Sequence, residues 1–212
     1  MYSQNNERRV IAEYFGDKKG VLLDIGANDG VFFSNSFDLI INKGWQACLV
    51  EPSQKAFSRL YNLYKDNDSA NLFMYAIGNK TGMVDFWESG GIYEDFMDTS
   101  LLSTIDEKSL HRWTEKPEIQ FTKTRTHVKT FSDFLLQSPV KMFDMISIDA
   151  EGMDVDILKQ MNLNELQTSL LIIEWVEDNK EIILRHMKES YPNLPLYVEN
   201  TENLIFAKTK RN

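Results

Sequence analysis

Short apolar runs alternate with amphipathic segments along most of this chain. Five runs have the length and the aliphatic composition of strands that are buried on both faces of a parallel sheet. They lie at residues 21–25, 47–50, 72–77, 143–148 and 170–175. Between them, apolar residues at helical spacing predict helices over 34–42, 53–64, 154–161 and 177–190. The alternation predicts one α/β domain over residues 1–212, with a Rossmann-like, mostly parallel sheet.

Two regions depart from this alternation. Residues 196–198 and 204–207 predict two strands joined by 200–203, a closing antiparallel hairpin that brings the expected sheet to seven strands. Residues 80–130 form an insertion in which strand-like segments at 83–87 and 120–130 flank a polar, helix-like piece at 106–114. An insertion of this size usually covers a site or forms an interface. The alternative is a decorative hairpin at the edge of the sheet.

The first predicted strand ends in Asp24 and leads into the small residues Gly26-Ala27-Asn28-Asp29-Gly30. The two glycines allow positive φ and a close approach of a ligand to the backbone. We expect a helix to follow directly, and its free N–H groups can receive the carboxylate of a methionine. Asp24 can accept a hydrogen bond from an ammonium group but would repel a pyrophosphate, and the pattern G-x-G-x-x-G is missing. These features favour S-adenosyl-L-methionine over a dinucleotide.

Glu51 ends the second predicted strand and strengthens this interpretation. A carboxylate in that place faces the crevice at the carboxyl ends of the strands and can accept both hydroxyls of a ribose. The alternatives are a tight strand–helix turn that binds nothing and a solvated acid at a strand end. The two features at this spacing make the ligand site the better explanation.

Composition narrows the possible partners. The net charge of −9 and the pI of about 4.9 argue against a nucleic-acid partner, because phosphate neutralisation needs clustered Lys and Arg. Cys48 is the only cysteine, so no internal disulfide can form. The polar start MYSQNNERR lacks the apolar core of a signal peptide, and no apolar run approaches the ~20 residues of a membrane span. We therefore expect no membrane partner and cytoplasmic residence.

Six short segments at predicted strand ends or in the insertion carry a resemblance to a known family. They lie at residues 24–30, 51–53, 76–78, 100–101, 128–134 and 146–154. The last contains the D-x-E-G pattern from Asp149 to Gly152, directly after the fourth predicted strand. Together they resemble the FkbM family of S-adenosylmethionine-dependent O-methyltransferases, and the D-x-E-G pattern is what narrows the resemblance to it. Ser147 stands where many members of the family carry Lys and others Ser.

The resemblance implies the fold of a class I methyltransferase, S-adenosyl-L-methionine as cofactor, and transfer to a hydroxyl of a sugar, a polyketide or another small molecule. We therefore expect a small-molecule or carbohydrate hydroxyl acceptor as the partner. Combined with the loop and the strand-end acids, the resemblance predicts the cofactor-binding residues. These are Asp24, Gly26, Ala27, Asn28, Gly30, Glu51, Pro52, Ser53, Ala76, Ile77 and Asp149.

Three acids end the fourth and fifth predicted strands or lie just beyond them: Asp149, Glu151 and Glu174. Removing the proton of an acceptor hydroxyl can be done by a carboxylate or a histidine, so the catalytic candidates are Asp149, Glu151 and His127. His127 and His111 both lie in the insertion and either could be the base, although a lone surface histidine is commoner. For Glu151 the structural alternative is an acid at a helix start, which the helix dipole favours.

A divalent metal could lower the pKa of the hydroxyl instead. Asp149 and Glu174 are similar in position to the acids that hold magnesium in catechol-type methyltransferases. The third ligand there is usually an adjacent Asn, and Trp175 occupies that place here. We therefore expect no metal, with a site on Asp149 and Glu174 as the alternative.

Two other functions compete with an O-methyltransferase. A nicotinamide-dependent oxidoreductase would use the same sheet, but the missing glycine pattern and the terminal hairpin argue against it. A catalytically inactive binding protein would show damage at Asp24, Gly26 or Glu51, and all three residues are intact.

Overall fold

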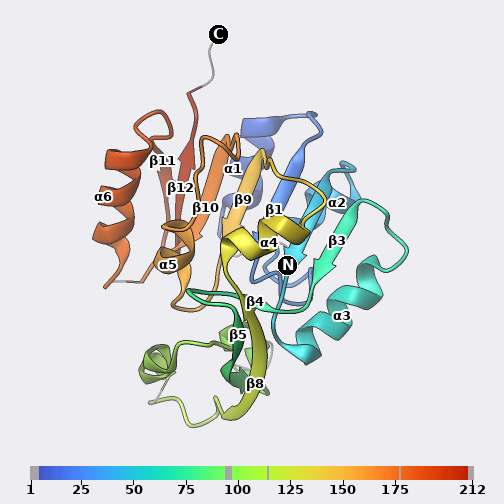
Figure 1. The fold of residues 1–212 in the computed structure, drawn as a ribbon, viewed down its shortest axis with the longest axis vertical. Coiled ribbons are helices and arrows are strands. Elements are labelled where there is room, and N and C mark those ends of the chain that lie inside the picture. Colours follow the sequence, from blue (N-terminus) through green and yellow to red (C-terminus); the bar gives the residue numbers. More distant parts are fainter. Residues whose placement is uncertain (1–4, 94–96, 114, 177, 210–212) are drawn as a thin grey trace.

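A seven-stranded sheet forms the centre of the computed structural model, which describes residues 5–93, 97–113, 115–176 and 178–209. Its strands are Val21–Ile25 (β1), Gln46–Val50 (β2), Ala70–Phe73 (β3), Met145–Ile148 (β9), Leu170–Glu174 (β10), Leu196–Glu199 (β11) and Asn203–Ala207 (β12). Their order is β11-β12-β10-β9-β1-β2-β3 (Figure 1). Only β12 runs antiparallel to its neighbours β10 and β11. The predicted mostly parallel sheet with a closing hairpin is confirmed.

Helices cover both faces of this sheet. They are Glu7–Phe15 (α1), Phe37–Ile41 (α2), Gln54–Tyr64 (α3), Phe131–Gln137 (α4), Asp154–Leu158 (α5) and Lys180–Ser190 (α6). The first three pack on the face that carries Leu22 and Leu49, and the last three on the face that carries Leu23 and Ile146. Side chains of successive strand residues point to opposite faces, so each core strand contributes to both apolar clusters. This double coverage explains why the strands read as continuous apolar runs.

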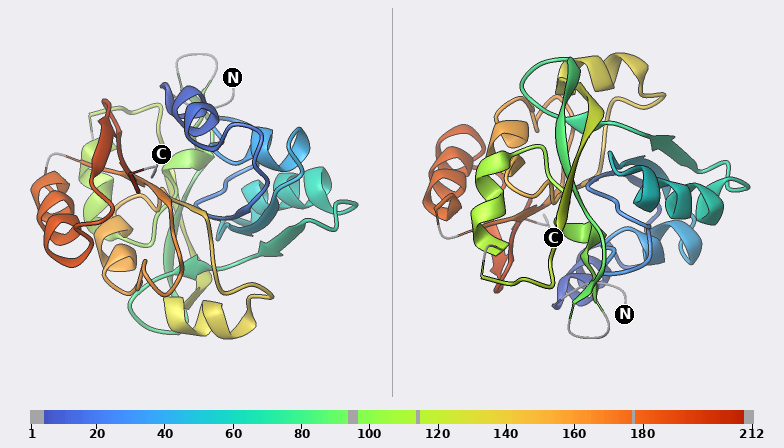
Figure 2. Two further views of the ribbon diagram at one scale, coloured as in Figure 1. Left: turned by 90° about the horizontal axis from the view of Figure 1, so that it is seen from above. Right: turned by 90° about the horizontal axis from the view of Figure 1, so that it is seen from below.

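The insertion forms a second, smaller structure at the carboxyl ends of the parallel strands, drawn below the large sheet in Figure 1. Ala76–Ile77 (β4), Gly82–Ser89 (β5) and Phe121–Lys129 (β8) make a three-stranded sheet in the order β4-β8-β5. Ile92–Tyr93 (β6) and Met97–Asp98 (β7) pair with each other. Two 3₁₀ helices follow, Thr99–Leu102 (η1) and Glu107–Trp113 (η2). Seen from below in Figure 2, β5 and β8 cross in front of the large sheet.

The predicted third strand, 72–77, is wrong as a single element. Its first half belongs to β3, where Phe73 pairs with Val50. Its second half is β4, which pairs with β8 through Ala76 and Val128. The chain leaves the large sheet at Met74, which is half exposed. One apolar run thus contributes a strand to each of two sheets, because its two halves pair with different strands.

The prediction of a helix directly after the glycine loop is also wrong, since α2 begins only at Phe37. Side chains satisfy the backbone donors of this stretch locally. Asp29 accepts hydrogen bonds from the N–H groups of Val31 and Phe32, at 2.9 Å each. Ser34 accepts a hydrogen bond from the N–H of Phe37 at 3.0 Å. Its side chain therefore satisfies a backbone donor at the start of α2, although Ser34 lies before the helix. Such local bonds compete with helix formation.

Several boundaries of the predicted helices also differ. The segment predicted at 106–114 is the 3₁₀ helix η2, and the helix predicted at 154–161 ends at Leu158. Thr114 and Glu177, expected at helix ends, lie outside the described residues. Among the described residues, no helix combines the length and the apolar character needed to cross a bilayer.

Candidate active site

Two adjoining cavities lie where the insertion meets the carboxyl ends of β1, β2, β9 and β10. The first, here called the slot, has a volume of about 50 Å³. The second, here called the chamber, has a volume of about 270 Å³. Residues that line both are Gly26, Asn28, Leu101, Asp149 and Glu151. The two cavities are therefore neighbouring parts of one site.

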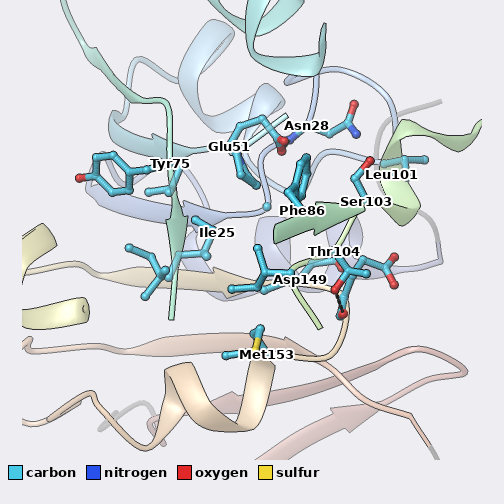
Figure 3. Close-up of a pocket in the computed structure, with 18 of the residues that line it drawn as sticks. Ile25, Asn28, Glu51, Tyr75, Phe86, Leu101, Ser103, Thr104, Asp149 and Met153 are labelled. Carbon is cyan, nitrogen blue, oxygen red and sulfur yellow. Dashed lines mark hydrogen bonds between the residues drawn. The ribbon is translucent and has the colours of Figure 1, made fainter. Parts of the chain in front are cut away.

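The slot is mainly apolar, with Glu51 in its wall and Asp149 and Glu151 where it meets the chamber. Its apolar lining is Ile25, Val50, Tyr75, Ala76, Ile77, Phe86, Leu101, Ile105 and Met153. Glu51 and Met153 lie on opposite sides of it (Figure 3). This composition suits a flat, weakly polar group that carries hydrogen-bond donors at one end.

Glu51 is held in place by backbone donors. Its Oε2 accepts a hydrogen bond from the N–H of Asn28 at 2.9 Å, and its Oε1 accepts from the N–H of Ser53 at 2.7 Å. Burial raises the pKa of Glu51 to about 7, although these two N–H bonds act in the opposite direction. Each carboxylate oxygen can accept more than one bond, so Glu51 retains capacity for donors of a ligand.

Asp24 lies in β1, just before the glycine loop, and lines the chamber. It is 5% exposed, and its Oδ2 accepts a hydrogen bond from the hydroxyl of Ser36 at 2.6 Å. Burial raises its pKa to about 6, while the bonds from Ser36 and Ser147 lower it. A cationic group of a ligand in the chamber could therefore pair with this carboxylate.

The glycine loop passes very close to the end of β9. Gly26 has φ of +87°, and a Cβ atom there would lie 1.7 Å from the carbonyl oxygen of Asp149. Only glycine can occupy this position without moving one of the two chains. The loop after β1 and the acid after β9 are thereby held against each other.

The segment from Asp149 to Gly152 forms a tight turn with an unusual backbone. Glu151 has φ of +48°, and Gly152 has φ of +107°. Asp154 holds the turn by accepting hydrogen bonds from the N–H groups of Ala150 and Gly152, at 2.8 and 3.1 Å. From the insertion, the hydroxyl of Thr104 donates to the carbonyl oxygen of Glu151 at 2.7 Å. Positive φ at a residue other than glycine is costly and is concentrated at functional sites.

Three carboxylates meet in the chamber. Ile148 of β9 pairs in parallel register with Ile173 of β10, so the next residues, Asp149 and Glu174, end side by side. Glu151 joins them, and one oxygen from each of the three lies within 4.8 Å of the others. Oε2 of Glu174 is buried and has no hydrogen-bond partner within the described part of the chain. The three acids at the ends of the fourth and fifth predicted strands thus lie together at one edge of the sheet.

Burial raises the pKa of all three acids, and neighbouring carboxylates add to the effect. Asp149 keeps surface that faces the cavity, yet protein surrounds it on most sides, and this burial and the charge of Glu151 raise its pKa well above the usual range. Burial and the charge of Asp149 do the same for Glu174. Burial raises the pKa of Glu151 to about 7 against the opposing effect of Arg112. Arg112 of η2 forms an ion pair with Glu151; burial acts to lower its pKa, but the carboxylates, Glu151 first, raise it.

Most residues predicted for the site line one of the cavities. These are Asp24, Gly26, Ala27, Asn28, Glu51, Pro52, Ala76, Ile77, Asp149, Glu151 and Glu174. Gly30 and Ser53 line neither cavity. Gly30 packs against Leu60 with φ of +77°, and Ser53 lies behind Glu51 and caps α3. Their part is to shape the wall and to orient Glu51.

The structure does not bring the predicted histidines to the site. His127 is exposed on β8, between the buried residues Thr126 and Val128, and lines neither cavity. The strand alternation directs its side chain away from the face that packs on the site. His111 is also exposed and lines neither cavity.

Sequence reasoning missed Arg112, Asp154 and Thr104. Asp154 had a local signal, because an acid two residues beyond a glycine turn can accept the turn's N–H groups. Arg112 and Glu151 are 39 positions apart, and Thr104 and Glu151 are 47 apart. No local pattern links such pairs, so the path of the insertion was needed to find them.

Comparison with known proteins identifies the family. The model of the methyltransferase FkbM domain matches residues 24–197, which is most of the chain. The chain belongs to the FkbM methyltransferase family. The FkbM match ends inside β11 and includes the whole insertion, the slot and every lining residue of the chamber except Glu202. No curated protein matches the sequence.

Solved structures agree on the fold of this FkbM domain. The crystal structure of methyltransferase FkbM from Methylobacillus flagellatus KT is similar with a TM-score of 0.58 and 15% identity, over 89% of this chain and 43% of that one. The METTL16 MTase domain has a TM-score of 0.51 and 9% identity, over 98% of this chain and 67% of that one. Monomeric WbdD has a TM-score of 0.50 and 11% identity, over 96% and 41%. This chain therefore has the class I methyltransferase fold, and it spans less than half the length of the FkbM structure.

Proposed function

We propose that this chain is an S-adenosylmethionine-dependent O-methyltransferase that acts on a hydroxyl of a small molecule or sugar. The observation that carries the proposal is the junction of the two cavities. The slot, with the buried carboxylate of Glu51, opens at Asp149 into a chamber with three clustered acids. Two reactants of different chemistry can therefore meet beside Asp149.

The residues of the slot fit the nucleoside of the cofactor. Its apolar lining suits an adenine ring, and Glu51 has free acceptor capacity for the two ribose hydroxyls. Asp24, in the chamber wall next to the loop, suits the ammonium group of the methionine. When bound, S-adenosylmethionine supplies an electrophilic methyl group on a sulfonium.

The residues of the chamber fit a polyhydroxylated acceptor. Phe32, Phe33 and Trp113 give it aromatic walls, while Asp149 and Glu151 offer carboxylate oxygens to hydroxyl donors. Both acids would hold the acceptor hydroxyl in one orientation and favour loss of its proton. Holding a reactant and withdrawing its proton are each established sources of rate enhancement.

Calorimetry with S-adenosylmethionine tests the cofactor site through Glu51→Gln. The amide keeps the volume of the side chain but loses the charge, and it presents an N–H donor where two backbone N–H groups now bind. Hydrogen bonds to a charged group contribute about 1.5–3 kcal/mol, so the affinity should fall roughly ten- to a hundredfold. Glu13→Gln, an exposed change on α1, is the matched control and should leave the affinity unchanged.

The proposal also requires turnover. Formation of S-adenosylhomocysteine should depend on a hydroxylated acceptor in a panel of sugars and polyols. Equal cofactor affinity in a folded Glu51→Gln protein would contradict the assignment of the slot. Binding without any acceptor-dependent product across the panel would favour the inactive binding protein instead.

A further inference from the structure

The carboxylates of Asp149, Glu151 and Glu174 have a spacing that suits one metal ion. One oxygen from each lies within 4.8 Å of the other two. Ligand oxygens lie about 2.0–2.6 Å from Mg²⁺ or Ca²⁺, so two oxygens of one coordination sphere are at most ~4–5 Å apart. Small rotations of the side chains would bring all three oxygens to a common ion.

Glu174 gives a second observation that points to a ligand. Its Oε2 is buried and accepts no hydrogen bond from the described residues, while the rest of the residue keeps some surface and lines the chamber. A buried carboxylate without a partner is strongly unfavourable. Among the described residues, Arg112 forms its ion pair with Glu151 and not with Glu174. A cation between the three acids would remove this cost.

The charge balance of the chamber favours binding of a cation. Its lining contains one lysine, Lys116, and five acids. The acids are Asp24, Asp149, Glu151, Glu174 and Glu202. Asp24 is assigned to the ammonium group of the cofactor, and Arg112 offsets one charge, that of Glu151. Of the other three acids, Glu202 accepts a hydrogen bond from the amide of Asn5 at 3.0 Å, which leaves Asp149 and Glu174.

We propose that Asp149, Glu151 and Glu174 together bind one divalent cation of the Mg²⁺ or Mn²⁺ type in the chamber. The donor set consists of carboxylates alone, without His or Cys, which suits these hard ions better than zinc or copper. Glu151 takes the role of third ligand that the sequence position of Trp175 does not supply, and its pairing with Arg112 orients it. Three protein ligands leave coordination positions open for water and for acceptor oxygens.

This cation deepens the proposed function and rests on it. A divalent ion next to Asp149 would bind the acceptor hydroxyl and lower its pKa. The proton would then pass to water in the chamber. A sugar with two neighbouring hydroxyls could occupy two of the open positions, so the inference also narrows the acceptor to molecules that chelate, such as vicinal diols.

Titration of the chelator-treated, full-length protein with Mn²⁺ tests the site without relying on activity. The electron paramagnetic resonance signal of free Mn²⁺ should show one bound ion per chain. Glu174→Gln should weaken binding at least tenfold, whereas Glu165→Gln, an exposed change before β10, should have no effect. No binding up to ~1 mM Mn²⁺, the weak end for protein sites of this type, or equal binding by Glu174→Gln, would overturn the proposal.

Thermal unfolding of the same proteins gives a second measurement and controls for folding. Without metal, Glu174→Gln should be at least as stable as the parent protein, because it removes a buried acid whose Oε2 has no hydrogen-bond partner among the described residues. Mn²⁺ should raise the Tm of the parent protein and of Glu165→Gln but leave that of Glu174→Gln unchanged. An equal rise in all three proteins would overturn the site.

Calorimetry with S-adenosylmethionine on these samples separates the two proposals. Cofactor binding without Mn²⁺ binding would overturn only the cation. Mn²⁺ binding without cofactor binding would overturn only the proposed function.

Discussion

Single residues with unusual backbone conformations join the two parts of the site. Gly26 lets the loop after β1 touch the carbonyl of Asp149, and Gly152 lets the turn after β9 touch the insertion. A Cβ atom at Gly152 would lie 2.1 Å from Oγ of Ser109. Glu151, between these contacts, is itself at φ of +48°. The position of its carboxylate therefore depends on two glycines that carry no chemistry of their own.

Gly152→Ala tests this dependence. The variant adds backbone strain, about 1–3 kcal/mol for a residue in a rare φ region, and a collision with Ser109. Gly82→Ala is the matched control, since Gly82 also has positive φ, +152°, but no atom within 4 Å of its Cβ position. We expect Gly152→Ala to lose more stability and to lower methyl transfer at least tenfold, measured by thermal unfolding and by S-adenosylhomocysteine formation.

Relief of the collision gives the decisive control. Adding Ser109→Ala removes the Oγ atom and should restore part of the activity of Gly152→Ala. If the two single glycine variants behave alike, the contact with η2 does not position Glu151.

The residues at the site divide into those that the sequence predicts and those that it does not. Asp24, Glu51 and Asp149 end apolar runs, and parallel strands carry their ends to one edge, so these positions were predictable. Arg112 reaches Glu151 through the path of the insertion, for which the sequence has no periodic signal. The histidines were predicted from their chemistry alone, and strand alternation placed His127 on the outer side.

At the scale of elements, α3 connects the insertion to the glycine loop. Arg59 of α3 donates a hydrogen bond to the hydroxyl of Ser100 in η1 at 2.9 Å. The amide of Asn28 donates to the same hydroxyl at 3.4 Å, and Arg59 lies 4.0 Å from Asp29. Ser100 and Leu101 line the slot. A helix of the core thus holds η1 over the expected nucleoside site.

Arg59→Met should weaken this connection while keeping the apolar stem of the side chain. Because Arg59 is exposed, we expect a moderate effect, a rise in the Kd for S-adenosylmethionine of roughly three- to tenfold. Lys65→Met, at the other end of α3, is the matched control. Calorimetry measures both, and an equal affinity in the two variants would show that the bond to Ser100 does not support cofactor binding.

Elements with long apolar patterns were predicted well, and elements defined by local hydrogen bonds were not. The parallel strands and the closing hairpin follow from apolar runs. The delayed start of α2 depends on the side chains of Asp29 and Ser34, whose competition with a helix is hard to weigh in advance. The division between β3 and β4 depends on β8, about fifty residues further along the chain.

At the scale of the whole molecule, buried acids make stability depend on pH. The pKa of Asp24 is raised to about 6 and that of Glu51 to about 7, above the values of 3.8 and 4.5 expected in an unfolded chain. Between these limits the folded protein holds more protons than the unfolded chain does. The free energy of unfolding must therefore fall as the pH rises through this window. The ligand-free protein should be more stable in mild acid than at alkaline pH.

Thermal unfolding between pH 5.5 and pH 8 measures this trend in protein free of cofactor and divalent ions. One pKa unit corresponds to about 1.4 kcal/mol, so Glu51 alone contributes about 2 kcal/mol over this range. For a domain of this size we expect the Tm to be roughly 4–8 °C higher at pH 5.5. Glu51→Gln, which cannot titrate, should show a smaller difference. A Tm that stays constant or rises toward pH 8 would contradict the inference that burial raises the pKa of Asp24 and Glu51.

The pairing of β4 with β8 has a consequence for how this protein can diversify. The chain enters the insertion at Ile77 and leaves it at Lys129, and these residues are partners in the small sheet. The N–H of Gly78 also bonds to the carbonyl of Lys129 at 2.9 Å. Since the two ends already meet, changing the length between them adds little loop-closure entropy. The segment can therefore be exchanged as a unit, and because it lines both the slot and the chamber, a replacement would reshape the two cavities together.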